Sequence, residues 1–290
     1  MQQTILVTGA TGTVGREVVK QLAMLDNIRV RAGVHSVIKG ENLRRLPDVE
    51  IVEMEFTDPD SLHAAFTHAD KVFLITPFTD EQVEMAKKLV DEARRTGVKH
   101  IVKLSAMGAG AEHGIQLGRW HREIEDYIKE SGIPYTFLRP SSFMQNIENY
   151  NAQTIKEEGK LYMPTGEGKV PYIDARDIAV VAVEALTGNG HEGKIYDLTG
   201  PEELTGAEIA EALSAATGKP VTYVDVPEDA ARQSMQQQQL PEWFISSFLE
   251  LCGVQRAGHA GTTNHQVEQL TGCKPHTFRQ FAHDYKDCFI

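Results

Sequence analysis

The sequence predicts an α/β protein with a doubly wound parallel sheet and a smaller, mainly helical C-terminal lobe. Two observations support this prediction. Short apolar segments alternate with amphipathic helical segments through the first half of the chain. A glycine-rich turn joins the first apolar segment to the first helical segment. Beyond residue 227 the chain reads as helices and loops only.

The alternation can be followed along the chain. Asp58 followed by Pro59 is typical of a helix start, and Gly97 is typical of a helix end. Because crossover connections between parallel strands place helices on both faces, the order predicts a sheet covered on both sides. The expected strands are residues 5–7, 28–34, 50–54, 71–76, 100–105 and 134–139, and helices are expected at residues 81–95 and 119–130.

A turn with the spacing G-x-x-G-x-x-G follows the first strand. Gly9 permits the turn, Gly12 leaves room for a pyrophosphate, and Gly15 lets the helix pack close to the strand. The N–H groups at the helix start would then face the phosphates. A glycine-rich turn of another α/β protein is the alternative, but the strand–turn–helix context favours a Rossmann-type dinucleotide site. The predicted contacts are Gly9, Thr11, Gly12, Thr13, Val14 and Gly15.

The second half is less regular. We expect an extended piece at residues 170–174 before a helix at 175–186, and strands at 194–198 and 221–226. Thr205 with Glu208 three residues later predicts a capping box. No linker rich in Gly, Ser or Pro separates the halves. We therefore expect residues 1–150 to form an NAD(P)-binding Rossmann domain, and residues 151–290 to complete the sheet and form the small substrate-side lobe.

The end of the second strand favours NADPH over NADH. An NAD site of this type usually has an acidic residue there, which holds the ribose 2′-OH. This stretch has no acid, and His35, Ser36 and Lys39 would suit a 2′-phosphate. The alternative is that they are ordinary loop residues, since the bidentate arginine of such sites is missing. The other predicted cofactor contacts are Glu55 and Phe56 near the adenine, and Thr76 and Pro77 near the nicotinamide ribose.

Composition limits the classes of function. The formal net charge is −12, and so acidic a chain gains little from counterion release, which argues against nucleic-acid binding. The 11 histidines lack H-E-x-x-H spacing and the three cysteines lack C-x-x-C, so we expect no metal and reduced thiols. Without a signal segment or an apolar run of membrane-spanning length, we expect a cytoplasmic protein with no membrane partner.

Six segments together resemble the NmrA-like family of atypical short-chain dehydrogenases/reductases, and they span nearly the whole chain. They are VTGATGTVG at 7–15, TDPDSL at 57–62, GVKHIVKLSA at 97–106, SGIPYTFLRPSSFMQN at 131–146, VPYIDARDIA at 170–179 and YDLTGPEELTGAEIA at 196–210. The chain looks closest to the bacterial branch of NADPH-dependent quinone reductases and triphenylmethane-dye reductases. The resemblance implies NADPH as cofactor, with neither metal nor flavin. The family also includes nucleotide-binding proteins that sense redox state without turnover.

The resemblance also implies where a reaction would occur. Ordinary short-chain dehydrogenases use Tyr-x-x-x-Lys on the helix after the fifth strand, with the tyrosine as proton donor. Aligned on Glu125, this chain has His121 at the lysine position and Leu117 at the tyrosine position. Ser105 keeps the place of the superfamily's serine. His121 and Ser105 are therefore the candidate catalytic residues. The alternatives are a helix histidine bonded to backbone or to the nicotinamide ribose, and a serine that caps the strand.

The missing tyrosine limits the classes of reaction that the site could catalyse. Alcohol–ketone chemistry needs a group that exchanges a proton with the oxygen, whereas a quinone or cationic dye is electrophilic and can take protons from water. We therefore expect an NADPH-dependent oxidoreductase that transfers hydride to a quinone-like or aromatic dye-like acceptor. The alternative is a non-catalytic NAD(P)-binding redox sensor that acts through a protein partner. A sugar-nucleotide epimerase is disfavoured, because that chemistry normally needs the tyrosine.

Substrate contacts are expected from the second half of the chain. Asn146 and Tyr172 would line the cleft, although either could be structural. An apolar helix with Trp243, Phe244 and Phe248 is more typical of core than of a substrate lid. The expected partner is a small aromatic or quinone-like substrate, and a homodimer is compatible with the sequence.

Overall fold

The computed structural model describes residues 2–290 and divides the chain into two compact units. The first comprises residues 2–111, Gly118–Arg139 and Ile178–Asp197. The second comprises Glu112–Leu117, Pro140–Asp177 and Leu198–Ile290.

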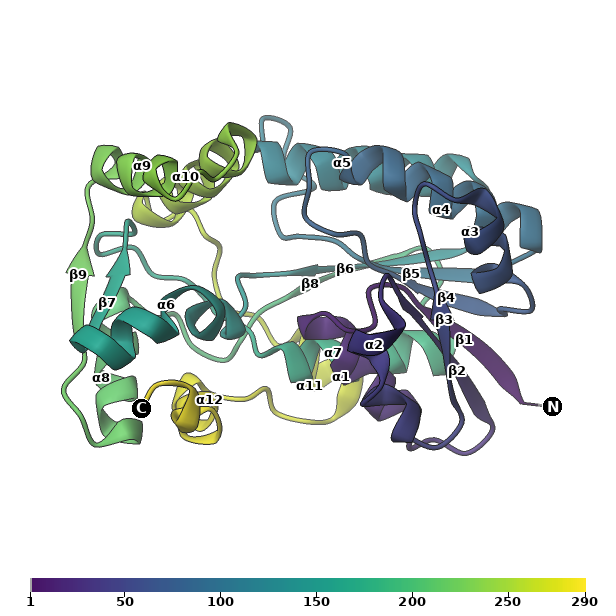
Figure 1. Ribbon diagram of the computed structural model, residues 1–290, viewed down its shortest axis with the longest axis horizontal. Helices are drawn as coiled ribbons and strands as arrows, with labels where there is room; N and C mark the ends of the chain where they lie inside the picture. Colours follow the sequence, from purple (N-terminus) through teal and green to yellow (C-terminus); the bar gives the residue numbers. More distant parts are fainter. Residues whose placement is uncertain (1) are drawn as a thin grey trace. The chain divides into compact units, whose positions relative to one another are not determined.

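A seven-stranded sheet in the order β3-β2-β1-β4-β5-β6-β8 forms the centre of the first unit (Figure 1). The neighbouring strands from β3 to β6 pair in parallel, as predicted. The strand order reverses between β1 and β4, and ligands of such sheets bind at the carboxyl ends of the strands beside this point. The bounds are β1 (Gln3–Val7), β2 (Ile28–Val34), β3 (Val49–Glu53), β4 (Lys71–Leu74), β5 (His100–Leu104), β6 (Tyr135–Pro140) and β8 (Lys194–Leu198).

Helices cover both faces of this sheet (Figure 1). One face carries α3 (Pro59–Phe66), α4 (Gln82–Thr96) and α5 (Gln116–Glu130), and the other carries α1 (Thr13–Leu22) and α7 (Ala175–Thr187). The short helices α2 (Val37–Gly40) and η1 (Leu43–Arg45) lie between β2 and β3 in the sequence. Leu6, Leu74 and Phe137 are buried in the core shared with α3, α4 and α5. The doubly wound fold predicted from the sequence is thus confirmed.

Local sequence signals set several element ends. Asp58 caps α3 by accepting a hydrogen bond from the Asp60 N–H at 3.0 Å. Gly97 ends α4 with a φ of 78°, a left-handed conformation that favours glycine. The capping box of Thr205 and Glu208 opens α8 (Gly206–Thr217), as predicted.

The second unit is mainly helical, with a separate two-stranded sheet. Strand β7 (Lys160–Met163) pairs in parallel with β9 (Thr222–Asp225). Strand β7 was not predicted, because a four-residue strand that follows a helix directly has too little periodicity to identify. Residues beyond 227 form only helices and loops, as expected. The remaining elements are α6 (Gln145–Glu158), α9 (Glu228–Gln237), α10 (Glu242–Arg256), α11 (Gln266–Thr271), α12 (Phe278–Asp284) and η2 (Lys286–Cys288).

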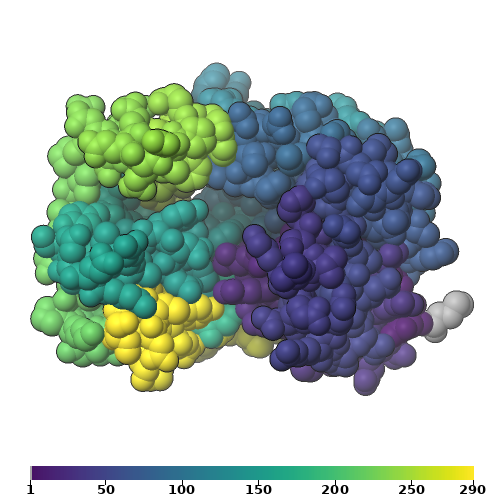
Figure 2. All heavy atoms as spheres, in the orientation of Figure 1, coloured from purple at the N-terminus to yellow at the C-terminus, as the bar shows by residue number. Residues whose placement is uncertain are grey.

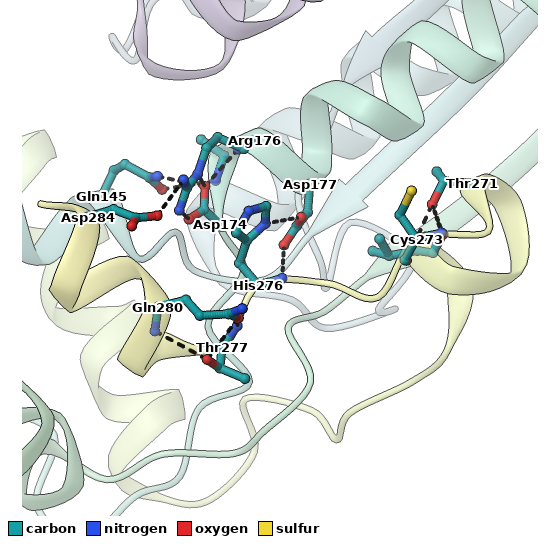
Figure 3. Close-up of polar contacts among 12 residues, drawn as sticks. Gln145, Asp174, Arg176, Asp177, Thr271, Cys273, His276, Thr277, Gln280 and Asp284 are labelled. Carbon is teal, nitrogen blue, oxygen red and sulfur yellow. Dashed lines mark hydrogen bonds and ion pairs between the residues drawn. The ribbon is translucent and has the colours of Figure 1, made fainter.

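Polar contacts fix the C-terminal segment within the second unit (Figure 3). Arg176 donates to Asp174 from Nη2 at 2.7 Å, and its Nη1 donates to Asp284 on α12 at 2.8 Å. His276 holds Asp177 twice, through Nδ1 at 2.6 Å and through its backbone N–H at 2.8 Å. Asp174 and Asp177 therefore help to hold the C-terminal segment in place within this unit.

Candidate cofactor and active site

The glycine loop lies at the carboxyl end of β1. Gly9 has a φ of 59°, and a Cβ on Gly15 would lie 2.2 Å from the Gly9 carbonyl oxygen. The turn itself therefore requires both glycines. Gly12 differs, because it is exposed and a Cβ there would meet only the Gly9 oxygen, at 3.2 Å. The packing of the protein therefore does not require a glycine at this position. The absence of a side chain here would instead leave room for a ligand in front of Gly12.

The start of α1 suits a pyrophosphate. Among the described residues no side chain caps this helix, and its first turn carries no acidic residue. The first N–H groups of a helix have no partner within the helix, so those of Thr13, Val14 and Gly15 can bind an anion. Thr11 and Gly12 are exposed in front of them. The loop residues thus fit a dinucleotide.

The structure brings together predicted residues from the ends of β2 and β3. Nδ1 of His35 lies 3.0 Å from Oε2 of Glu55. The backbone N–H and the hydroxyl of Thr57 also donate to Glu55, and these bonds lower the pKa of its carboxyl. Phe56 packs, partly buried, against the sheet core. The His35–Glu55 pair was not expected, because its residues are distant in sequence.

The residues proposed to hold a 2′-phosphate lie at the surface. Ser36 is the N-cap of α2 and Lys39 is in its last turn. His35 and Lys39 are exposed, and the α2 segment lies on the viewed surface of the first unit, in dark purple (Figure 2). A phosphate could therefore reach both side chains, but it would compete with Glu55 for His35.

The loop after β4 and the first residue of α4 contain buried polar atoms without a partner among the described residues. Thr76 and Pro77 lie in this loop, which leads into α4. Within the described residues, neither Thr79 Oγ1 nor Gln82 Nε2 has a hydrogen-bond partner, and Gln82 is 1% exposed. Buried polar groups are nearly always paired. Since β4 lies beside β1, these atoms are candidate ligand contacts that the sequence pattern did not reveal.

A buried polar cluster joins β5, β6 and α5. The Ser105 hydroxyl donates to Glu125 Oε1 at 2.6 Å. Arg139 donates to the same carboxylate twice, at 2.9 and 2.5 Å, and this bonding raises the pKa of its guanidinium. The Glu125 side chain is 1% exposed. Because the Ser105 hydroxyl donates its only proton to Glu125, it can only accept a hydrogen bond from a ligand.

His121 contacts Lys103, a residue that was not identified from the sequence. Nζ of Lys103 lies 2.8 Å from Nδ1 of His121 and 3.0 Å from the Leu104 carbonyl oxygen. Burial lowers the pKa of Lys103 to about 7. Burial, together with the nearby Lys103 charge, holds the pKa of His121 well below its usual range. A signal for Lys103 existed, since it is two residues from Ser105 on a strand and therefore shares its face.

The expected substrate residues lie in the second unit. Tyr172 is 3% exposed and belongs to the core formed with α6, α8 and α12, and burial raises the pKa of its phenol. Asn146 is half-buried in the first turn of α6. On α10 the rings of Phe244 and Phe248 stack with centroids 6.3 Å apart. Contact of Tyr172 and Asn146 with substrate stays a prediction.

Residues 2–290 contain neither a membrane-spanning helix nor a metal-binding cluster. No helix in this range is both long and apolar enough to cross a membrane. Nor do three or more His, Cys, Asp or Glu side chains gather there as a metal ion would need. Cys252, Cys273 and Cys288 are all free thiols, and Cys252 is buried.

The fold and the glycine loop define an NAD(P)-binding protein of the Rossmann class. Residues 1–282 match the NmrA-like family, and the chain belongs to this family. An NAD(P)H azoreductase of Xenophilus azovorans is 41% identical over 285 residues, which cover 98% of this chain and 99% of that protein. A (4-alkanoyl-5-oxo-2,5-dihydrofuran-3-yl)methyl phosphate reductase of Streptomyces griseus is 36% identical over 289 residues, with 98% and 99% covered.

Solved structures share this fold. The NADPH-dependent quinone oxidoreductase QOR2 of Escherichia coli, complexed with NADPH, has a TM-score of 0.85 at 25% identity, covering 97% of this chain and 99% of that one. The triphenylmethane reductase of Citrobacter sp., complexed with NADP(H), has a TM-score of 0.82 at 27% identity, with the same coverage. The resemblance seen in the sequence is thereby confirmed.

Proposed function

We propose that this chain is an NAD(P)H-dependent reductase that transfers hydride from NADPH to a quinone-like or aromatic dye-like acceptor. The observation that carries the proposal is the polar cluster at the end of β5. It contains Ser105, whose hydroxyl donates to Glu125, and the neutral imidazole of His121. Leu117 stands where ordinary short-chain dehydrogenases have the tyrosine that donates a proton. The full-length similarity to an NAD(P)H azoreductase and to quinone and triphenylmethane reductases supports the same class of acceptor.

The chain's own residues would mainly bind and orient. When bound, the cofactor supplies the hydride. The start of α1 and the exposed Gly12 would hold the pyrophosphate, and the loop after β4 would hold polar groups near the reacting end. Ser105, fixed by Glu125, would accept a hydrogen bond from a ligand hydroxyl. Since such acceptors are electrophilic, holding donor and acceptor in contact accounts for most of the expected rate enhancement.

Turnover tests this proposal directly. The purified protein should oxidise NADPH in the presence of a small quinone, an azo dye or a triphenylmethane dye. His121→Ala should lower kcat by less than about 10²-fold, the low end of the range for a general acid–base group, because positioning dominates. A larger loss with unchanged NADPH affinity would show that proton donation by His121, and not positioning, accounts for most of the rate enhancement. Tight nucleotide binding without turnover of any acceptor would favour the sensor alternative.

The cofactor preference is a separate prediction. We expect NADPH to bind at least about tenfold more tightly than NADH, which corresponds to about 1.4 kcal/mol. The reason is that no acid ends β2, while His35 and Lys39 are exposed beside it. Fluorescence titrations with both nucleotides measure the ratio. Glu55→Gln should increase it, because the variant removes the charge that competes for His35. Equal affinities in the native protein would contradict the preference.

A further inference from the structure

We propose that Lys103 is a positioning residue for His121: it fixes the imidazole proton on Nε2 and replaces that proton after His121 has given it to the reduced acceptor. The replacement of the proton rests on the proposed reductase function, whereas the fixing of the proton on Nε2 does not. Lys103 and His121 both lie in the first unit, on β5 and α5.

The contact geometry determines which atom donates. Lys103 lies in the middle of the sheet, in register with Leu74 of β4 and Phe137 of β6, and it is 1% exposed. While Lys103 is protonated, its ammonium group has three donors and no acceptor, so Nδ1 of His121 accepts at the observed 2.8 Å. A neutral imidazole that accepts at Nδ1 carries its proton on Nε2. Within the described residues no hydrogen bond involves Nε2, so this N–H remains for a ligand.

Burial of Lys103 makes its proton easy to lose, and the charges nearby do not offset it. The charged groups that face it are Glu125 on α5, which raises its pKa, and Arg139 on β6, which lowers it. Glu125 already bonds Arg139 and Ser105, so Lys103 has no carboxylate of its own. β4 offers the apolar Leu74 beside Lys103 in the sheet. With burial as the largest influence, the pKa of Lys103 falls to about 7, and this ammonium can release its proton near neutral pH.

The proton transfer balances as follows. An acceptor that has received one hydride lacks one proton. The Nε2–H bond of His121 breaks as the new O–H or N–H bond of the product forms, and Nδ1 takes a proton from Nζ of Lys103. Lys103 is then a neutral amine and His121 a neutral imidazole with its proton on Nδ1. A proton from water arriving at Nε2, with return of the Nδ1 proton to Nζ, restores the starting state.

The tautomer can be measured without turnover. In ¹⁵N-labelled protein at pH 6, long-range ¹H–¹⁵N correlation spectra should show His121 protonated on Nε2, with the signal assigned by its loss in His121→Gln. Lys103→Met should populate the Nδ1–H form, because Nδ1 loses its donor. Lys71→Met is the matched control, since Lys71 is also a strand lysine but donates to the Leu186 carbonyl at 2.6 Å. A native proton on Nδ1, or an unchanged tautomer in Lys103→Met, would overturn the positioning role.

Proton replacement has its own readout in the pH profile of quinone reduction between pH 6 and 9. The ammonium form is present below its pKa, so the native rate should fall as pH rises through about 7. Lys103→Met should be about tenfold slower at pH 6, with a flat profile, and Lys71→Met should keep the native profile. Lys103→Arg should keep the Nε2–H tautomer but lose the pH-dependent limb, because a guanidinium does not release its proton. A native-like limb in Lys103→Met would contradict the relay. Absence of turnover in the native protein would contradict the reductase proposal and the relay, while the tautomer measurement would still decide the positioning role.

Discussion

Gly12→Val should abolish NAD(P)H binding and leave the protein folded. The φ of Gly12 is −75° and its ψ is 174°, an extended conformation that valine adopts readily. A Cβ there meets only the Gly9 carbonyl oxygen at 3.2 Å, so the protein itself can accommodate the side chain with a small shift. The branched group would fill the space in front of the α1 N–H groups, where a pyrophosphate must approach. We expect Kd to rise by at least about 100-fold, or about 2.8 kcal/mol.

Fluorescence titration gives the affinity of the Gly12→Val protein, and circular dichroism with thermal unfolding shows that it is folded. Gly15→Ala is the matched variant with the opposite outcome. Its Cβ would lie 2.2 Å from the Gly9 carbonyl oxygen, so the turn must move and the protein should lose stability. A folded Gly12→Val protein with normal NADPH affinity would show that the phosphate loop is wrongly assigned.

The glycine loop could be predicted because its signal is local. Gly9, Gly12 and Gly15 lie within one strand–turn–helix segment, so their spacing carries the geometry. The capping box of Thr205 and Glu208 is local in the same way, and the structure confirms it. Strand β7 escaped prediction because its four residues acquire their identity only by pairing with β9, some sixty residues later.

The chemistry around His121 depended on burial and could not be predicted in the same way. The sequence places Lys103 in a strand, but only the packing of β4, β6 and α5 around it makes the residue 1% exposed. The unpaired Gln82 amide and the His35–Glu55 pair likewise depend on contacts between segments distant in sequence. Ser105 and Glu125 were each noted from the family resemblance, whereas their hydrogen bond is a finding of the structure.

Glu125→Ala is expected to lower the free energy of unfolding by about 3–5 kcal/mol. The substitution leaves the Arg139 guanidinium, whose side chain is 14% exposed, without its two hydrogen bonds and its counter-charge. It also frees the Ser105 hydroxyl in a buried site. Removing one partner of a buried ion pair costs more than removing both, since the remaining charge stays desolvated. Urea unfolding followed by circular dichroism measures the change.

The double variant Glu125→Leu with Arg139→Met separates this cause from loss of packing. Apolar groups of similar volume leave neither member of the ion pair as an unpaired charge, so the double variant should recover most of the lost free energy of unfolding. Glu84→Ala is the surface control: Glu84 pairs with Lys87 at 3.1 Å but its side chain is 72% exposed, so we expect a change within about 0.5 kcal/mol. If Glu125→Ala cost no more than this control, the cluster would not be the buried, charge-balanced site described for the end of β5.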